Sequence, residues 1–143
     1  MKAIISALVL LGTLVLGGCA SGPQFDKAEG TIAPLAAGKG RVFIYRSSAV
    51  GGLIQPDVKL NGVVVGSATP HGVFYVDKDP GNISIVIGTE VEKTLTFTLG
   101  AGEVRYVKCG VNMGILAARI IPELVDPADA KKEMSDLAFT GGK

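Results

Sequence analysis

In the stretch Glu92-Lys93-Thr94-Leu95-Thr96-Phe97-Thr98-Leu99, polar and apolar side chains alternate without interruption. Successive side chains of a β-strand point to opposite faces, so Leu95, Phe97 and Leu99 are predicted to share the face that meets the core. The threonines then lie on the other face, in contact with solvent. This alternation is typical of a strand in an antiparallel sheet that has one buried face.

The segments before this strand predict further strands joined by tight turns. Ile83, Ile85 and Ile87 share one face of a predicted strand. It follows the sequence Asp-Pro-Gly-Asn at 79–82, in which Pro and Gly occupy positions that favour a turn. Another strand is predicted over 72–76.

A hairpin is predicted around Asn61-Gly62, which lies between the apolar runs 57–60 and 63–65. Both central residues of this turn need positive φ, which asparagine and glycine tolerate. The first strand is predicted over 41–46, where aromatic and β-branched residues dominate. A Gly-rich loop over 47–56 joins this strand to the hairpin.

The C-terminal third of the chain predicts two more strands and one helix. The strands are predicted over 103–111 and 118–125, and Pro122 indicates a sheet edge or a bulge because proline has no N–H. The helix is predicted to begin after Asp126 as N-cap, with Pro127 at its first position. Its apolar face is formed by Ala130, Met134 and Leu137.

Together these elements predict a mainly β fold, an antiparallel β-sandwich with one short C-terminal helix. The sandwich is assigned to residues 39–126, and the helix and tail to residues 127–143. About 125 residues remain after the signal described next, which is enough for one domain.

The N-terminus has the pattern of an export signal. Lys2 is followed by the apolar run 3–16, and Gly17 and Gly18 stand directly before Cys19. The apolar run is shorter than the ~20 residues that a membrane-spanning helix needs. Residues 1–18 are therefore predicted to be a signal peptide.

The sequence Leu16-Gly17-Gly18-Cys19 resembles the lipobox of bacterial lipoprotein precursors. The resemblance implies cleavage before Cys19, a diacylglyceryl group on its sulfur, and acylation of its new amine by a fatty acid such as palmitate. Ala20 and Ser21 follow without an aspartate, which by resemblance to Gram-negative lipoproteins implies the outer membrane, facing the periplasm. The alternatives are an uncleaved signal anchor and an ordinary signal peptide cut near Ala20.

Residues 19–38 are predicted to be the lipidated cysteine and a flexible linker. From Gly22 to Gly40 the chain is rich in Gly, Ala and Pro and has neither a helical nor a strand period. Such a tether would provide reach between the lipid and the domain. The alternative is that part of this segment packs as an edge strand.

The charge balance argues against nucleic acid as a partner. Of the 14 basic residues one, Lys2, lies in the signal, which leaves 13 against 13 acidic residues. A nucleic-acid-binding surface needs a basic excess. The expected partners are the lipid bilayer, through acylated Cys19, and an envelope protein.

The sequence predicts no catalytic, cofactor or metal constellation. His71 is the only histidine, and its Pro-His-Gly context is typical of an exposed turn. Neither Ser47 nor Ser67 has the Gly-x-Ser-x-Gly context of a catalytic serine. Asp77 and Asp79 supply too few oxygens for a calcium loop.

Two features remain as candidates for interaction. Cys109 would be the only thiol once Cys19 is acylated, and it is expected to be a buried apolar residue. The alternative is an intermolecular disulfide in the oxidising periplasm. The second feature is an apolar, Gly-rich candidate interaction loop, for which the alternative is a crossover packed on the core. The loop consists of Val111, Asn112, Met113, Gly114, Ile115 and Leu116.

Several short segments occur in a characteristic order along the chain. They are Gly38–Arg46, Val58–Gly62, Val65-Gly66, Pro80-Gly81, Thr94–Phe97, Gly102–Val107, Gly110–Gly114 and Pro122–Val125. Together they resemble bacterial lipoproteins of domain-of-unknown-function family 2846, over about Gly38 to Met134. The resemblance implies a small β-sandwich related in style to PEGA-type and carboxypeptidase-regulatory-like domains. It implies no established activity. Arg105 departs from the family pattern, which tends towards a second tyrosine beside Tyr106.

The expected function is that of a membrane-anchored envelope lipoprotein whose non-enzymatic sandwich binds a protein or another envelope component. Two alternatives remain at this point, a hydrolase-like envelope enzyme and a purely structural surface protein.

Overall fold

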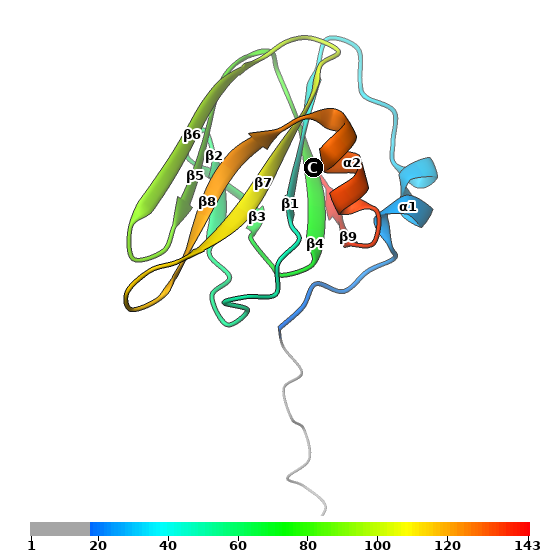
Figure 1. Ribbon diagram of the computed structural model, residues 1–143. Helices are drawn as coiled ribbons and strands as arrows, with labels where there is room; N and C mark the ends of the chain where they lie inside the picture. The colour runs from blue at the N-terminus through cyan, green and yellow to red at the C-terminus, as the bar shows by residue number, and fades with distance from the viewer. Residues whose placement is uncertain (1–17) are drawn as a thin grey trace, which may run out of the picture.

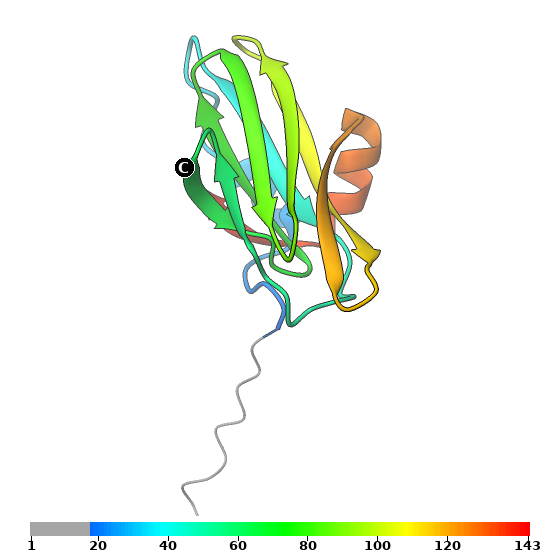
Figure 2. The same ribbon diagram turned by 90° about the vertical axis from the view of Figure 1, so that its left-hand side faces the viewer.

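Two β-sheets pack face to face, and the helices cover the outer face of the larger sheet (Figures 1 and 2). The structure is a computed structural model that describes residues 18–143. The predicted signal peptide lies outside the described residues, apart from Gly18.

The described elements confirm the prediction of a mainly β fold with one short helix near the C-terminus. In chain order they are α1 (Phe25–Ala28), the 3-10 helix η1 (Glu29–Thr31), β1 (Gly40–Arg46), β2 (Asp57–Leu60), β3 (Val63–Ser67), β4 (Gly72–Lys78), β5 (Gly81–Gly88), β6 (Glu92–Leu99), β7 (Val104–Met113), β8 (Ala118–Val125), α2 (Pro127–Met134) and β9 (Ala138–Gly142).

The larger sheet has the order β8-β7-β1-β4-β9, and the smaller sheet has the order β3-β2-β5-β6. Most neighbours are antiparallel, as predicted, but β1 pairs with β7 and β4 with β9 in parallel. These two parallel pairs depart from the antiparallel pairing that was predicted for the sandwich. They join strands that are distant in sequence, and the alternation of side chains reports burial rather than the direction of a neighbour.

The core between the sheets contains the apolar faces that the alternation predicted. Ile83, Ile85 and Ile87 are buried there, and so is Leu99. The hairpin between β2 and β3 also forms as predicted, with φ of 49° at Asn61 and 84° at Gly62. Pro122 lies on β8, an edge strand of the larger sheet, which is one of the two settings that its missing N–H predicts.

A second core lies on the other face of the larger sheet, under α1 and α2. Because both faces of this sheet are covered, every residue of β1 is buried. The residues of this core are Phe25, Phe43, Tyr45, Val73, Tyr106, Ala130, Met134 and Leu137.

The flexible linker predicted over 19–38 is wrong for the part of it that contains α1. Phe25 and Ala28 are buried, and the Phe25 ring meets the Phe43 ring edge-on with their centroids 5.5 Å apart. The Phe25 amide donates to the Leu137 carbonyl at 2.8 Å, and the Phe139 amide donates to the Pro23 carbonyl at 2.8 Å. The segment has no period because α1 is a single turn, held by one aromatic ring rather than by an amphipathic face.

The C-terminal helix begins where the sequence predicts, but the tail that follows it is not irregular. Asp126 occupies the N-cap position with extended backbone, although its side chain makes no capping hydrogen bond. After α2 the chain forms β9, which extends the larger sheet beside β4. Five residues with two glycines carry too weak a pattern to predict a strand. The domain therefore extends beyond the predicted limits of 39–126 at both ends.

Candidate functional site

Cys19, the predicted lipidation residue, lies exposed at one end of the sandwich. The chain on both sides of it is bonded to loops of the domain. The Gln55 side-chain amide donates to the Gly18 carbonyl at 2.9 Å. The Ala20 amide donates to the Pro70 carbonyl at 2.9 Å. Cys19 is thus held against the domain while its sulfur faces solvent.

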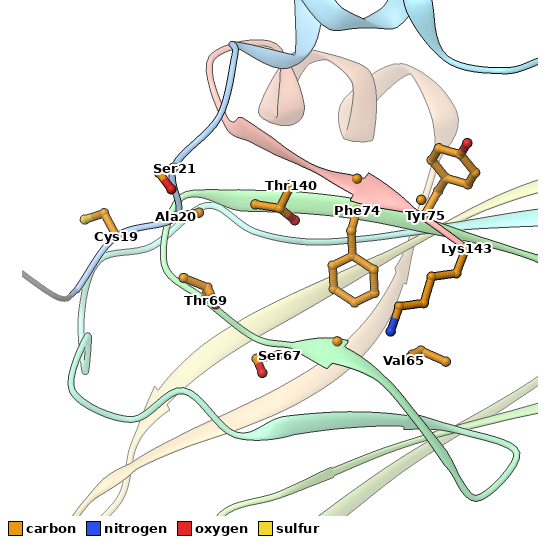
Figure 3. Close-up of a pocket in the computed structure, with 13 residues that line it drawn as sticks. Cys19, Ala20, Ser21, Val65, Ser67, Thr69, Phe74, Tyr75, Thr140 and Lys143 are labelled. Carbon is orange, nitrogen blue, oxygen red and sulfur yellow. The ribbon is translucent and has the colours of Figure 1, made fainter.

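An open groove of about 550 Å³ starts beside Cys19 and runs between β3 and β9 (Figure 3). Its lining combines apolar and polar side chains from β3, β4 and the C-terminal residues. The Lys143 side chain points across the groove towards β3 in Figure 3. The lining includes Cys19, Ala20, Ser21, Val65, Ser67, Thr69, Phe74, Tyr75, Thr140 and Lys143.

Two glycines let aromatic rings close the floor of this groove. A Cβ on Gly66 would lie 2.7 Å from the Phe74 ring, and a Cβ on Gly142 would overlap the Tyr75 ring. Larger residues at either position would displace these rings. The groove therefore depends on close contact between aromatic side chains and strand backbone.

The strands that border the groove are edge strands. Within residues 18–143, β3 pairs only with β2. In the same part of the chain, β9 pairs with β4 and is otherwise joined only by the bridge between Gln24 and Ala138. Strand edges of this kind present backbone donors and acceptors that another extended chain can bind.

The candidate interaction loop 111–116 divides into two parts. Val111, Asn112 and Met113 belong to β7, and Val111 packs against the core between the sheets. The rest forms the turn between β7 and β8, in which Ile115 is 97% and Leu116 89% exposed. The alternative of a packed crossover is thus correct for Val111 but wrong for the tip.

A second exposed tip, in the loop 47–56, was missed by the sequence analysis. Leu53 is 97% exposed in this loop. The only sequence feature that could have indicated this tip is a single leucine near two glycines, which has no helical or strand period.

Arg46 holds this second loop from inside the protein. Its side chain is 1% exposed. Nη1 donates to the carbonyls of Ile54 and Ala68, both at 2.7 Å. Nη2 donates to those of Val50 at 2.7 Å and Gly51 at 3.1 Å. Burial lowers the pKa of Arg46. A charged residue at the end of a strand normally faces solvent, so no sequence pattern indicates this role of Arg46.

Asp77, near the end of β4, and Asp79, in the turn before β5, take part in ion pairs. Asp77 accepts two hydrogen bonds from the nearly buried Arg41, at 2.6 and 2.7 Å. Arg41 also lies 4.0 Å from the Tyr75 ring centroid, and its hydrogen bond to Asp77 raises the pKa of Arg41. Asp79 accepts from Lys39 at 2.7 Å, which lowers the pKa of Asp79.

The remaining candidate residues lie apart from one another. His71 is exposed on a turn with φ of 55°, as predicted for its context. No side-chain hydrogen bond links it to Ser47 or Ser67 in the described part of the chain. Residues 18–143 hold no group of three metal-ligating side chains. Among the helices in this range, none has the length and apolar character to cross a bilayer.

Cys109 lies in the core between the sheets and is 2% exposed, as expected for a lone cysteine in a strand. Burial raises the pKa of its thiol to about 12. A buried neutral thiol is a poor nucleophile, so this environment disfavours an intermolecular disulfide.

The comparisons with known proteins identify a family but no characterised relative. No curated protein and no solved structure matches the chain. The model of one family, described as "Protein of unknown function (DUF2846)", matches residues 36–120. This match runs from the residues before β1 into β8 and so covers most of both sheets. The chain therefore belongs to the DUF2846 family.

Proposed function

We propose that this protein is a lipid-anchored bacterial envelope protein, at the outer membrane and facing the periplasm, whose sandwich binds a partner protein without catalysing a reaction. The observation that carries the proposal is the groove between β3 and β9, which opens beside Cys19 and is bordered by two edge strands. A lipid on Cys19 would keep such a groove close to the membrane.

The groove suits an extended segment of a partner protein. A bound strand gains affinity from main-chain hydrogen bonds to a sheet edge, and pockets for alternate side chains give specificity. The edge of β3 is exposed, with Val63 60% and Val64 46% accessible. The floor offers Phe74 to an apolar side chain, while Ser67 and Lys143 offer polar contacts.

A binding role is favoured over an enzymatic one by how the charged side chains are used. Asp77, Asp79 and Glu133 each accept a hydrogen bond from another side chain of the domain. These groups hold elements together, and none of them lines the groove. A catalytic site would instead gather titratable groups in a cleft.

The lipid anchor is tested by Cys19→Ser in cells fed a labelled fatty acid. The wild-type protein is expected to carry the label, and the variant to lose it and to leave the membrane fraction or remain as precursor. A Cys109→Ser variant is the matched control, because it removes the other cysteine and should keep the label. Equal labelling of the Cys19→Ser variant would refute the anchor.

Partner binding is tested by placing a photo-crosslinking amino acid at Ser67 in the groove. Thr94 is the matched control, because it is also a small, exposed strand residue but lies on β6, at the opposite edge of the same sheet. A protein adduct from position 67 that is missing from position 94 is the expected result. If neither position yields an adduct, or if both positions yield the same adducts, the groove is not the binding site.

A further inference from the structure

Exposed apolar side chains gather on two loop tips at one end of the sandwich. Leu53 belongs to the loop between β1 and β2, and Ile115 and Leu116 belong to the turn between β7 and β8. Leu53 and Ile115 are each 97% exposed. The two loops are neighbours, because a Cβ on Gly51 would lie 2.7 Å from the Ala118 Cβ. Val50, in the first loop, is 55% exposed, and Met113, at the end of β7, is 73% exposed. We call these five residues the apolar tips.

The apolar tips lie at the end where the chain leaves Cys19. Figures 1 and 2 show the N-terminal segment, drawn in blue, entering the domain at the end that carries both loops, next to the loop between β1 and β2. Gln55, two residues after Leu53, donates its side-chain amide to the Gly18 carbonyl. The surface around the anchor position and the apolar surface are therefore continuous.

The contact from Gln55 survives the maturation that the proposed anchor requires. Cleavage before Cys19 removes Gly18 and its carbonyl. Acylation of the new amine places an amide carbonyl on the same nitrogen, where the Gly18 carbonyl stood. Gln55 can donate to this carbonyl as well, which would direct the start of the acyl chain past the loop that carries Leu53.

The composition and rigidity of the tips distinguish them from ordinary surface loops. Neither 47–55 nor 113–117 contains a charged residue. The first loop is held in shape by the buried guanidinium of Arg46, and the second by a hydrogen bond from the Gly114 amide to the Ala117 carbonyl at 2.9 Å. Single exposed apolar residues are common, but a contiguous group marks a surface that meets another phase or a partner.

We propose that the apolar tips insert into the surface of the same membrane that holds the lipid on Cys19. This inference rests on the proposed anchor and adds that the domain stands on the bilayer by this end rather than swinging on a tether. Apolar side chains enter the boundary between headgroups and acyl chains when an anchor already holds them there. Because the groove starts beside Cys19 and lies along β3 and β9, it would open sideways above the membrane.

The absence of tryptophan makes this orientation measurable, because one introduced indole is then the only one in the chain. Ile115→Trp and Leu53→Trp each place an indole on an apolar tip. Ala101→Trp is the matched control, since Ala101 is exposed on the turn before β7. The ten residues of β7 separate this turn from the tips by roughly 30 Å.

The experiment uses each variant as the cell processes it, reconstituted in vesicles of phosphatidylethanolamine and phosphatidylglycerol. Lipids with brominated acyl chains should quench most of the indole emission of Ile115→Trp and Leu53→Trp, and leave that of Ala101→Trp unchanged. If the three variants float with the vesicles but none is quenched, the anchor holds and the insertion is refuted, which leaves a protein partner as the occupant of the tips. Variants that carry no lipid and do not float would refute the anchor and the insertion together.

Discussion

At the scale of single residues, a buried guanidinium fixes the shape of the loop that carries Leu53. Arg46 donates to four backbone carbonyls, of which that of Gly51 also accepts from the Ile54 amide. Buried arginines are usually neutralised by a carboxylate. Here carbonyl dipoles take that role, and the charge is used to shape a loop rather than to bind a ligand.

We expect Arg46→Met to destabilise the protein by roughly 3 kcal/mol, because each orphaned buried acceptor costs about 1–3 kcal/mol and water can reach only some of them. Lys59→Met is the control, since Lys59 is exposed on β2 and should change stability by less than about 0.5 kcal/mol. Chemical denaturation measures both. Equal stability of the two variants would show that the carbonyls need no internal donor.

Cys109 provides a second test at this scale, in the Cys19→Ser background where it is the only thiol. The folded protein should react very slowly with a disulfide reagent at pH 8, and the unfolded protein rapidly, because only the exposed thiol ionises readily. Rapid reaction of the folded protein would place Cys109 at the surface.

The raised pKa of Cys109 also predicts how stability depends on pH. Above the ordinary thiol pKa the unfolded chain loses this proton, whereas the folded chain keeps it up to a pH of about 12. The unfolded state then binds fewer protons, so stability falls as the pH rises through this window. Cys109→Ala should make the free energy of unfolding less dependent on pH between about 9 and 12. An unchanged slope would exclude the thiol as its source.

At the scale of elements, β6 shows how far alternation can be trusted. The sequence correctly assigned Leu95, Phe97 and Leu99 to one face and the threonines to the other. The alternation could not predict how deeply each side chain on the core face is buried, because β6 is an edge strand of its sheet. Leu99 is 1% exposed, whereas Phe97 is only partly buried, with Arg105 5.6 Å from its ring centroid.

We therefore expect Leu99→Ala to cost about 2–5 kcal/mol and Phe97→Ala only about 1–3 kcal/mol, since a half-buried ring loses less on truncation than a core ring. Thr96→Ala, on the solvent face, should cost under about 1 kcal/mol. Denaturant midpoints of the three variants give the order. If Thr96→Ala were the most damaging, the register of the strand would be shifted by one residue.

The strands that sequence predicted are those with local evidence. The Asn61-Gly62 turn and the isoleucines of β5 carry their own signals, and they form as predicted. The parallel pairing of β1 with β7 and the strand β9 depend on contacts between distant segments, for which a short stretch holds no information. The same holds for the candidate site, because Cys19 was found from its motif, whereas the groove arises only when β3, β4 and β9 meet.

At the scale of the whole molecule, the domain has three layers, with the larger sheet between the smaller sheet and the helices. The segment predicted as a tether belongs to the third layer. Phe25 covers Phe43 from the outside, and the backbone of Pro23 and Phe25 bonds to the residues around β9. The N-terminal and C-terminal segments thus pack together on the outer face of the larger sheet.

This arrangement makes a prediction about where the domain begins. A chain that starts at Ala20 should fold with the full stability of the mature domain, whereas one that starts at Gly38 lacks Phe25, Ala28 and the bonds to Leu137 and Phe139. Both should give circular dichroism spectra dominated by β-structure, because the nine strands all follow Gly38. The shorter chain should nevertheless unfold at lower denaturant concentration.

Phe25→Ala in the longer chain should reproduce much of this loss of stability, about 3–5 kcal/mol, because it removes a core aromatic ring. Asp26→Ala changes the neighbouring exposed residue and should cost well under 1 kcal/mol, so it controls for disturbance of α1 itself. Equal midpoints for the two chains would mean that the segment before Gly38 contributes nothing to stability, and that it behaves in solution as a tether after all.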